Sequence, residues 1–102
     1  MSKKLVLTHK AVEACIQAHL KSIRSFGVNY LALFGSVARN QATTSSDLDF
    51  LVEFNGSATF DRYMDLKFFL EDLFECPVDL ITKRSLKPQL KATVLKEAIR
   101  VA

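Results

Sequence analysis

The stretch Leu33–Phe54, LFGSVARNQATTSSDLDFLVEF, joins two apolar runs through a tight turn and a polar segment. The first run stops at Gly35-Ser36, and after ten intervening residues Asp47 and Asp49 open the second run. Residues two apart on a strand project from the same face, so the two carboxylates lie side by side. Two anions held that close repel each other unless a cation lies between them. The pair therefore predicts a bound cation.

A third acid and the glycine turn indicate which ligand that cation carries. Asp79 is isolated among apolar residues, where a charge is costly unless it is paired or binds a metal. Mg²⁺ prefers oxygen ligands, often one or two carboxylates together with substrate phosphates. Gly35-Ser36 offers backbone N–H groups and a hydroxyl to an anion. The set predicts a site for a metal-bound nucleoside triphosphate, although each feature alone is also typical of ordinary strand ends, ion pairs and turns.

Working outward from this stretch, the residue pattern predicts alternating helices and strands. We expect helices over 8–26, 36–41 and 59–75, a final helix capped by Ser85 with Pro88 in its first turn, and strands over 28–34, 47–54 and 77–82. If the strands over 47–54 and 77–82 pair as neighbours, they should run parallel and Asp79 can lie beside Asp49. The five-residue connection after 28–34 is too short for the usual parallel crossover. We therefore predict an α/β (α+β) fold in which helices flank a small mixed sheet, formed by residues 1–102 as one domain.

Composition suits a globular protein of the cytoplasm. Of the 102 residues, 49% are hydrophobic and 25% are charged, and no apolar run approaches the roughly 20 residues of a membrane span. The N-terminus lacks the pattern of a secretory signal. Cys15 and Cys76 have no metal-binding spacing, so we expect reduced thiols. His19 lies on the apolar stripe of the first helix, where a core-edge role is expected rather than a catalytic one.

The charges are unevenly distributed along the chain. Residues 47–80 hold nine acidic and two basic side chains, whereas residues 1–46 and 81–102 each hold six basic and one acidic side chain. These groups could simply be solvated helix faces. They could instead form a cation-binding middle flanked by basic segments that meet an anionic ligand or partner.

The helix over 59–75 carries two apolar stripes. The main stripe comprises Tyr63, Leu66, Phe69, Leu70, Leu73 and Phe74. Phe60, Met64 and Phe68 form a second stripe at i, i+4 and i+8 between acidic residues. This second stripe is either buried in the core or exposed as a protein interface.

The motif set resembles a known family. G-S-x-x-R (Gly35, Ser36 and Arg39), then Ser46-Asp47-x-Asp49, then the later Asp79, is similar to the polymerase-β-type nucleotidyltransferases. Within that superfamily the chain resembles the minimal nucleotidyltransferase (MNT) antitoxins, which are usually encoded beside a helical HEPN toxin. The resemblance covers about residues 28–101 and implies a polymerase-β-like nucleotidyltransferase fold.

The resemblance also implies roles for individual residues. Gly35, Ser36 and Ser46 would bind the nucleotide. Asp47, Asp49 and Asp79 would bind Mg²⁺, with two ions expected, and Asp79 would help to activate the acceptor hydroxyl. Arg39 could contact phosphate or form a structural ion pair. Asn40 stands where family members often have Gly, and Asn tolerates the same left-handed conformation.

The implied activity is transfer of AMP from ATP to a hydroxyl, expected to be a tyrosine, of a HEPN toxin partner, with the chain acting as antitoxin. No membrane and no direct nucleic-acid substrate are expected, and a homo- or hetero-oligomer is possible. Two alternatives remain. The chain could be a non-catalytic antitoxin that masks its partner, or the nucleotide-binding subunit of a two-protein transferase with another acceptor.

Overall fold

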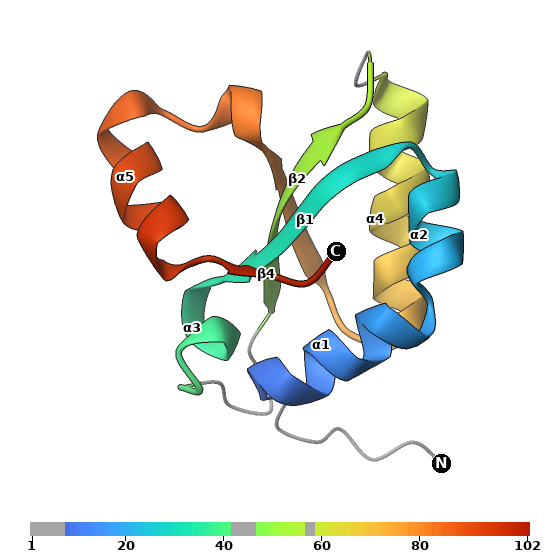
Figure 1. Ribbon diagram of the computed structural model, residues 1–102, viewed down its shortest axis with the longest axis horizontal. Coiled ribbons are helices and arrows are strands. Elements are labelled where there is room, and N and C mark those ends of the chain that lie inside the picture. Colours follow the sequence, from blue (N-terminus) through green and yellow to red (C-terminus); the bar gives the residue numbers. More distant parts are fainter. Residues whose placement is uncertain (1–7, 42–46, 57–58) are drawn as a thin grey trace.

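A computed structural model describes residues 8–41, 47–56 and 59–102, which form a mixed sheet flanked by helices (Figure 1). The elements are α1 (His9–Ala18), α2 (Leu20–Ser25), β1 (Val28–Phe34), α3 (Gly35–Ala38), β2 (Leu48–Phe54), α4 (Phe60–Phe74), β3 (Val78–Thr82), the 3₁₀ helix η1 (Lys83–Ser85), α5 (Pro88–Glu97) and β4 (Ile99–Arg100). The predicted α/β class is confirmed, and a helix or strand is present in each predicted segment, in the predicted order.

The sheet has the strand order β3-β2-β1-β4. β2 and β3 are parallel, as predicted, while β1 pairs antiparallel with both β2 and β4. The mixed sheet follows from the connections. α4 is long enough to cross over between parallel neighbours, whereas the short link between β1 and β2 reverses the chain.

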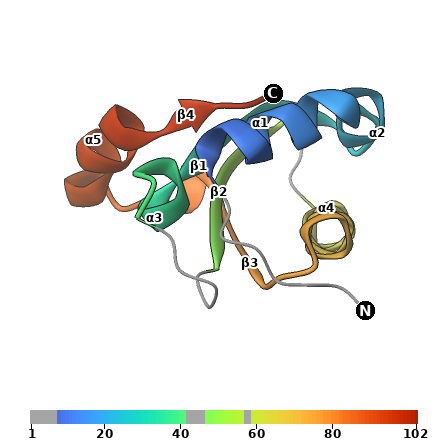
Figure 2. The same cartoon turned by 90° about the horizontal axis from the view of Figure 1, so that it is seen from below.

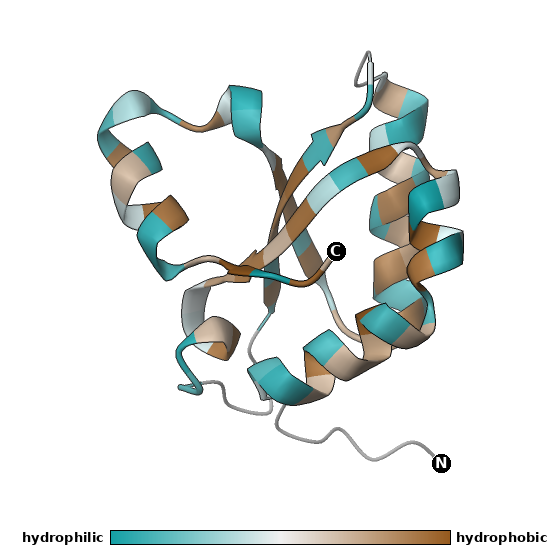
Figure 3. Cartoon of the chain, in the orientation of Figure 1, coloured by the Kyte–Doolittle hydropathy of each residue, from teal (hydrophilic) through white to brown (hydrophobic). Residues whose placement is uncertain are grey.

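One face of the sheet packs against the hydrophobic core. Leu48, Phe50 and Val52 are fully buried on it, against side chains of α1, α2 and α4. Figure 2 shows α2 and α4 on this side of the sheet and α5 on the other, and two residues of α3, Val37 and Ala38, also pack in the core. The hydropathy colouring of Figure 3 shows hydrophobic and hydrophilic residues alternating along the helices, with hydrophobic segments in the strands. Among the described residues, no helix is both long enough and apolar enough to cross a bilayer.

The first helix is interrupted, which the sequence pattern did not predict. Thr8 caps α1 by accepting a hydrogen bond from the Ala11 N–H, as expected of an N-cap. The backbone then leaves helical geometry at His19 (φ −118°), and α2 begins at the next residue. His19 is exposed; its Nδ1 lies 3.0 Å from the Cys15 carbonyl oxygen, and its ring meets the Phe69 ring edge-on. Cys15 and Cys76 are not joined in a disulfide.

The C-terminal segment differs most from expectation. Ser85 does not cap α5; it ends η1, and its hydroxyl lies 2.7 Å from that of Thr82. α5 starts without a side-chain cap, and Pro88 occupies its first turn as predicted. The two-residue strand β4 was not predicted, because such a short strand has no detectable period. It pairs with β1, and the Val101 that follows it is buried in the core.

The second stripe on α4 is largely exposed. Phe60 is 75% exposed and Phe68 is 53% exposed, whereas Met64 is half-buried. Burial of the whole stripe in the core, one of the two sequence alternatives, is therefore wrong for the two phenylalanines.

Candidate active site

The turn after β1 brings the backbone close to the acidic strand. Gly35 opens α3 with a φ of +77°, a conformation that disfavours side chains. A β-carbon at this position would overlap the Asp49 carboxylate. Gly35 lies beside Asp49 because the preceding residue, Phe34 at the end of β1, pairs with Asp49 across the sheet. Ser36 follows at half exposure, beside the same carboxylate strand.

Asp49 and Asp79 are direct cross-strand partners. The parallel register of β2 and β3 pairs them, as the sequence predicted. Residues in register on neighbouring strands project from the same face. Asp49 is half-buried, Asp79 is exposed, and Asp47 is exposed just before β2. The structure therefore brings two predicted metal-ligating residues together, with the third one residue before the strand.

The carboxylates affect one another electrostatically. The pKa of Asp49 is raised above its ordinary value of 3.8, first by burial and then by the negative charges of Asp79 and Asp47. The positive charge of Arg39 opposes this rise. Repulsion among like charges is the property expected of carboxylates that share a cation.

Arg39 forms an ion pair, one of its two predicted alternatives. Its guanidinium contacts Glu97 of α5 at 3.2 Å, and its Nε donates to the Gln41 side chain at 3.1 Å. The ion pair joins α3 to the end of α5. The Arg39 guanidinium remains close enough to Asp49 for its positive charge to lower the pKa of that carboxyl. Glu97 was not identified from the sequence, since 58 residues separate it from Arg39. Asn40 adopts the left-handed conformation (φ 56°) that was expected of it.

The donor set suits Mg²⁺ with a phosphate ligand. Over the residues that the structure describes, no group of three His, Cys, Asp or Glu side chains is gathered closely enough to hold a metal ion. Asp49 and Asp79 instead offer a pair of carboxylates, and Mg²⁺ completes such a site with water and substrate phosphates. Ser46, the remaining predicted nucleotide-binding residue, lies outside the described residues.

Comparison with known proteins agrees with this geometry. Residues 16–101 match the nucleotidyltransferase domain family. The protein adenylyltransferase MntA of Thermococcus cleftensis is 38% identical over 97 residues, covering 94% of this chain and 98% of the relative. A solved structure provisionally described as a minimal nucleotidyltransferase superposes with a TM-score of 0.80 at 38% identity, over 91% of this chain and 95% of that one.

A more distant solved structure shares the fold. It is a chain in a complex of tri-AMPylated Shewanella oneidensis HEPN toxin with MNT antitoxin, with a TM-score of 0.65 at 20% identity, covering 88% of this chain and 71% of that chain. The glycine turn, the cross-strand aspartates and these matches agree: the chain belongs to the nucleotidyltransferase domain family, among the relatives of the protein adenylyltransferase MntA.

Proposed function

We propose that this protein transfers AMP from Mg²⁺-bound ATP to a tyrosine hydroxyl of a HEPN-domain toxin, and so acts as its antitoxin in the cytoplasm. In this proposal residues 1–102 act as one minimal nucleotidyltransferase domain. The observation that carries the proposal is the pairing of Asp49 with Asp79 against the Gly35 turn. This arrangement places carboxylates that can bind a metal next to backbone N–H groups that can bind phosphate.

In this proposal the paired Asp49 and Asp79 hold the metal, and Asp47, one residue before β2, completes the ligand set when the metal binds. When bound, Mg²⁺ would neutralise charge on the phosphate oxygens and stabilise the entering and departing oxygens. Gly35 and Ser36 hold the triphosphate through backbone N–H groups and the hydroxyl, and Ser46 also contacts the nucleotide. Gly is needed at position 35 because a side chain would occupy the space of the Asp49 carboxylate.

The chemistry is an in-line displacement at the α-phosphorus. The acceptor hydroxyl oxygen bonds to the α-phosphorus as the bond to the β-phosphate oxygen breaks, and pyrophosphate leaves. Asp79 is the more exposed of the paired acids, so it is suited to meet an incoming acceptor and accept the hydroxyl proton. Asp49, half-buried against Gly35, is suited to orient the phosphates.

The partner is proposed from the relatives. MntA, whose length this chain matches almost completely, is named a protein adenylyltransferase. The distant S. oneidensis complex contains an MNT antitoxin and an AMPylated HEPN toxin.

Transfer of label from [α-³²P]ATP tests the proposal. The chain is incubated with Mg²⁺, with or without its HEPN-domain partner, and labelled protein is separated on a denaturing gel. We expect label on the partner, and loss of label by orders of magnitude in Asp49→Asn. Asp72→Asn, an exposed acid on α4, is the matched control and should label normally. Equal labelling by Asp49→Asn would refute the assignment of the site.

A further inference from the structure

A second charged site lies on the same face of the sheet as Asp49. The Lys83 ammonium lies 4.0 Å from the centroid of the Tyr30 ring, and the Arg100 guanidinium lies 5.2 Å from it. Tyr30 belongs to β1, Lys83 to η1 and Arg100 to β4, so three separate segments converge. Two of the basic residues concentrated in 81–102 thus meet over one aromatic ring. We call Tyr30, Lys83 and Arg100 the cation cluster.

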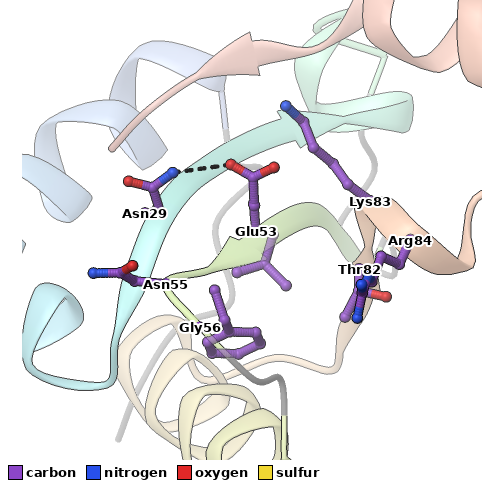
Figure 4. Close-up of a pocket in the computed structure, with 9 residues that line it drawn as sticks. Asn29, Glu53, Asn55, Gly56, Thr82, Lys83 and Arg84 are labelled. Atoms are coloured by element: carbon purple, nitrogen blue, oxygen red, sulfur yellow. Dashed lines mark hydrogen bonds between the residues drawn. The ribbon is translucent and has the colours of Figure 1, made fainter.

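A cavity of about 460 Å³ adjoins the cation cluster at the carboxyl ends of β2 and β3. Lys83 and Arg84 line one side of it, and Glu53 and Asn29 line the other. The Asn29 amide donates to Glu53 at 2.9 Å. In Figure 4 the Glu53 and Lys83 side chains extend to the same side of the sheet. The Glu53 carboxylate has a hydrogen-bond donor in Asn29, while Lys83 and Arg84 provide positive charge for a ligand.

The strand β3 connects the acidic site to the cation cluster, because it contains Asp79 and ends just before Lys83. This strand leads from Asp79 to Lys83 in four residues, a distance of about 13 Å in extended backbone. Tyr30 pairs with Glu53, and Asp49 lies on that same face four residues earlier in β2. Lys83 follows Thr82, the β3 partner of Val52, and its ammonium lies over the Tyr30 ring on β1, so its stem crosses over β2.

The geometry of in-line transfer indicates which ligand meets the cation cluster. The attacking oxygen must approach from the side opposite the leaving pyrophosphate. If pyrophosphate leaves at the Gly35 turn, which follows β1, the acceptor lies beyond Asp49, at Asp79 on β3. An acceptor that enters at Asp79 and continues along β3 then meets Lys83.

We propose that the cation cluster and its cavity bind an oxyanion carried by the acceptor polypeptide, at a position four residues along β3 from Asp79. This inference rests on the proposed function and adds to it the acceptor's chemistry. The oxyanion has two possible sources. One is an acidic side chain three or four residues from the tyrosine in an extended segment. The other is the phosphodiester of an AMP unit attached in an earlier turnover.

Charge-removing variants test the site. Lys83→Gln and Arg84→Gln, which remove the two cations that line the cavity, are compared with Lys91→Gln, an exposed lysine of α5 that does not line it. Two quantities are measured for each: the affinity for the HEPN-domain partner by calorimetry, and the affinity for Mg²⁺·AMP-PNP. We expect the first two variants to weaken partner binding about tenfold, as loss of one charge-assisted contact does, with nucleotide affinity unchanged. Lys91→Gln should match the wild type in both.

Two results would overturn the proposal. Weaker nucleotide binding with unchanged partner binding would make the cavity a nucleotide subsite. A lower melting temperature with both affinities unchanged would make the cation cluster purely structural. Partner binding is measured without turnover, so it reports on this site even if no AMP is transferred and the proposed function fails.

Labelling kinetics separate the two sources of the oxyanion. If an acidic side chain is bound, Lys83→Gln raises the acceptor KM for the first AMP, and replacing acids near the acceptor tyrosine by amides has the same effect. If a phosphodiester is bound, the calorimetric loss appears only with partner that already carries AMP. The first addition is then normal, and mass spectrometry of the intact partner shows that later additions stop.

Discussion

Gly35 and Asp49 lie so close together that no side chain fits between them. A β-carbon on Gly35 would overlap the Asp49 carboxylate, and the φ of +77° at Gly35 is itself unfavourable for any residue with a β-carbon. The backbone of the Gly35 turn therefore packs directly against the Asp49 side chain of β2. This contact makes the glycine of the motif a requirement of the site as well as of the turn.

Gly35→Ala should weaken nucleotide binding far more than an alanine substitution that causes backbone strain without a steric clash. Its matched control is Gly56→Ala, which has a similar φ of +82° but nothing within 4 Å of the added carbon. Both variants should lose about 1–2 kcal/mol of stability from the left-handed conformation. Only Gly35→Ala should also displace Asp49 and lose Mg²⁺·AMP-PNP affinity, measured by calorimetry. Equal affinity in both variants would argue against a phosphate-binding turn.

Asp49 and Glu71 should influence stability with opposite dependence on pH. The pKa of Asp49 is raised, chiefly by burial, so its contribution to stability is complete below about pH 3.8 and is lost as pH rises through the folded-state pKa. Asp49→Asn should therefore melt at or slightly above the wild-type temperature at neutral pH without metal. The difference should disappear in acid.

Glu71 provides the opposite case. Its carboxylate accepts hydrogen bonds from the Val78 N–H and from Lys67, which lower its pKa below 4.5. Its contribution is present above about pH 4.5 and is lost as pH falls through the folded-state pKa. Glu71→Gln should thus melt lower than the wild type at neutral pH, with a penalty that shrinks in acid. Melting curves of both variants from pH 3 to 8 that shift in the same direction would contradict the pair of assignments.

The site was predictable where one strand carries it. Alternation within 47–54 places Asp49 on a defined face, and a connecting helix favours parallel strands. The meeting of Asp49 with Asp79 therefore depended only on β2 and β3 being neighbours, which the structure shows. Glu97 and the cation cluster were not predictable. Their contacts join segments far apart in the chain, and only the excess of basic residues in 81–102 indicated an anionic ligand.

The fold was predictable to the same extent. Long periodic segments such as α4 gave correct elements, because many residues agree on one face. The break at His19 and the strand β4 depend on packing between segments, which local pattern does not contain. Ser85 was taken for a helix cap on residue type alone, but its hydroxyl pairs with Thr82 instead.

Asp79→Asn should lose transfer but retain more nucleotide affinity than Asp49→Asn. Asp79 is exposed and lies on the acceptor side of the proposed site, whereas Asp49 is half-buried against the phosphate turn. If Asp79 accepts the acceptor proton, its loss affects turnover more than binding. Calorimetric titration of both variants with Mg²⁺·AMP-PNP decides the matter. Equal loss of affinity would make Asp79 a metal ligand alone and remove its role as general base.

Phe68→Ala should leave the melting temperature almost unchanged. Phe68 is 53% exposed, and substitutions at exposed positions usually change stability by less than about 0.5 kcal/mol. Leu66→Ala, two residues earlier and fully buried, is the matched control and should cost about 2–5 kcal/mol. Thermal unfolding followed by circular dichroism measures both. A comparable loss of thermal stability in the two variants would show that Phe68 packs in the core.

Arg39 and Glu97 offer a way to separate an ion pair from a phosphate contact. Their side chains are 43% and 39% exposed, so the pair itself should contribute no more than about 1 kcal/mol to stability. Yet Arg39 lies near enough to Asp49 to oppose the rise in its pKa, so it can also meet a bound phosphate. We expect Glu97→Gln to change the melting temperature little and to leave Mg²⁺·AMP-PNP affinity intact or slightly higher, since the guanidinium is released. Arg39→Gln should lower that affinity about tenfold, the effect of losing a charge-assisted hydrogen bond. If both variants bind the nucleotide like the wild type, Arg39 serves only to join α3 to α5.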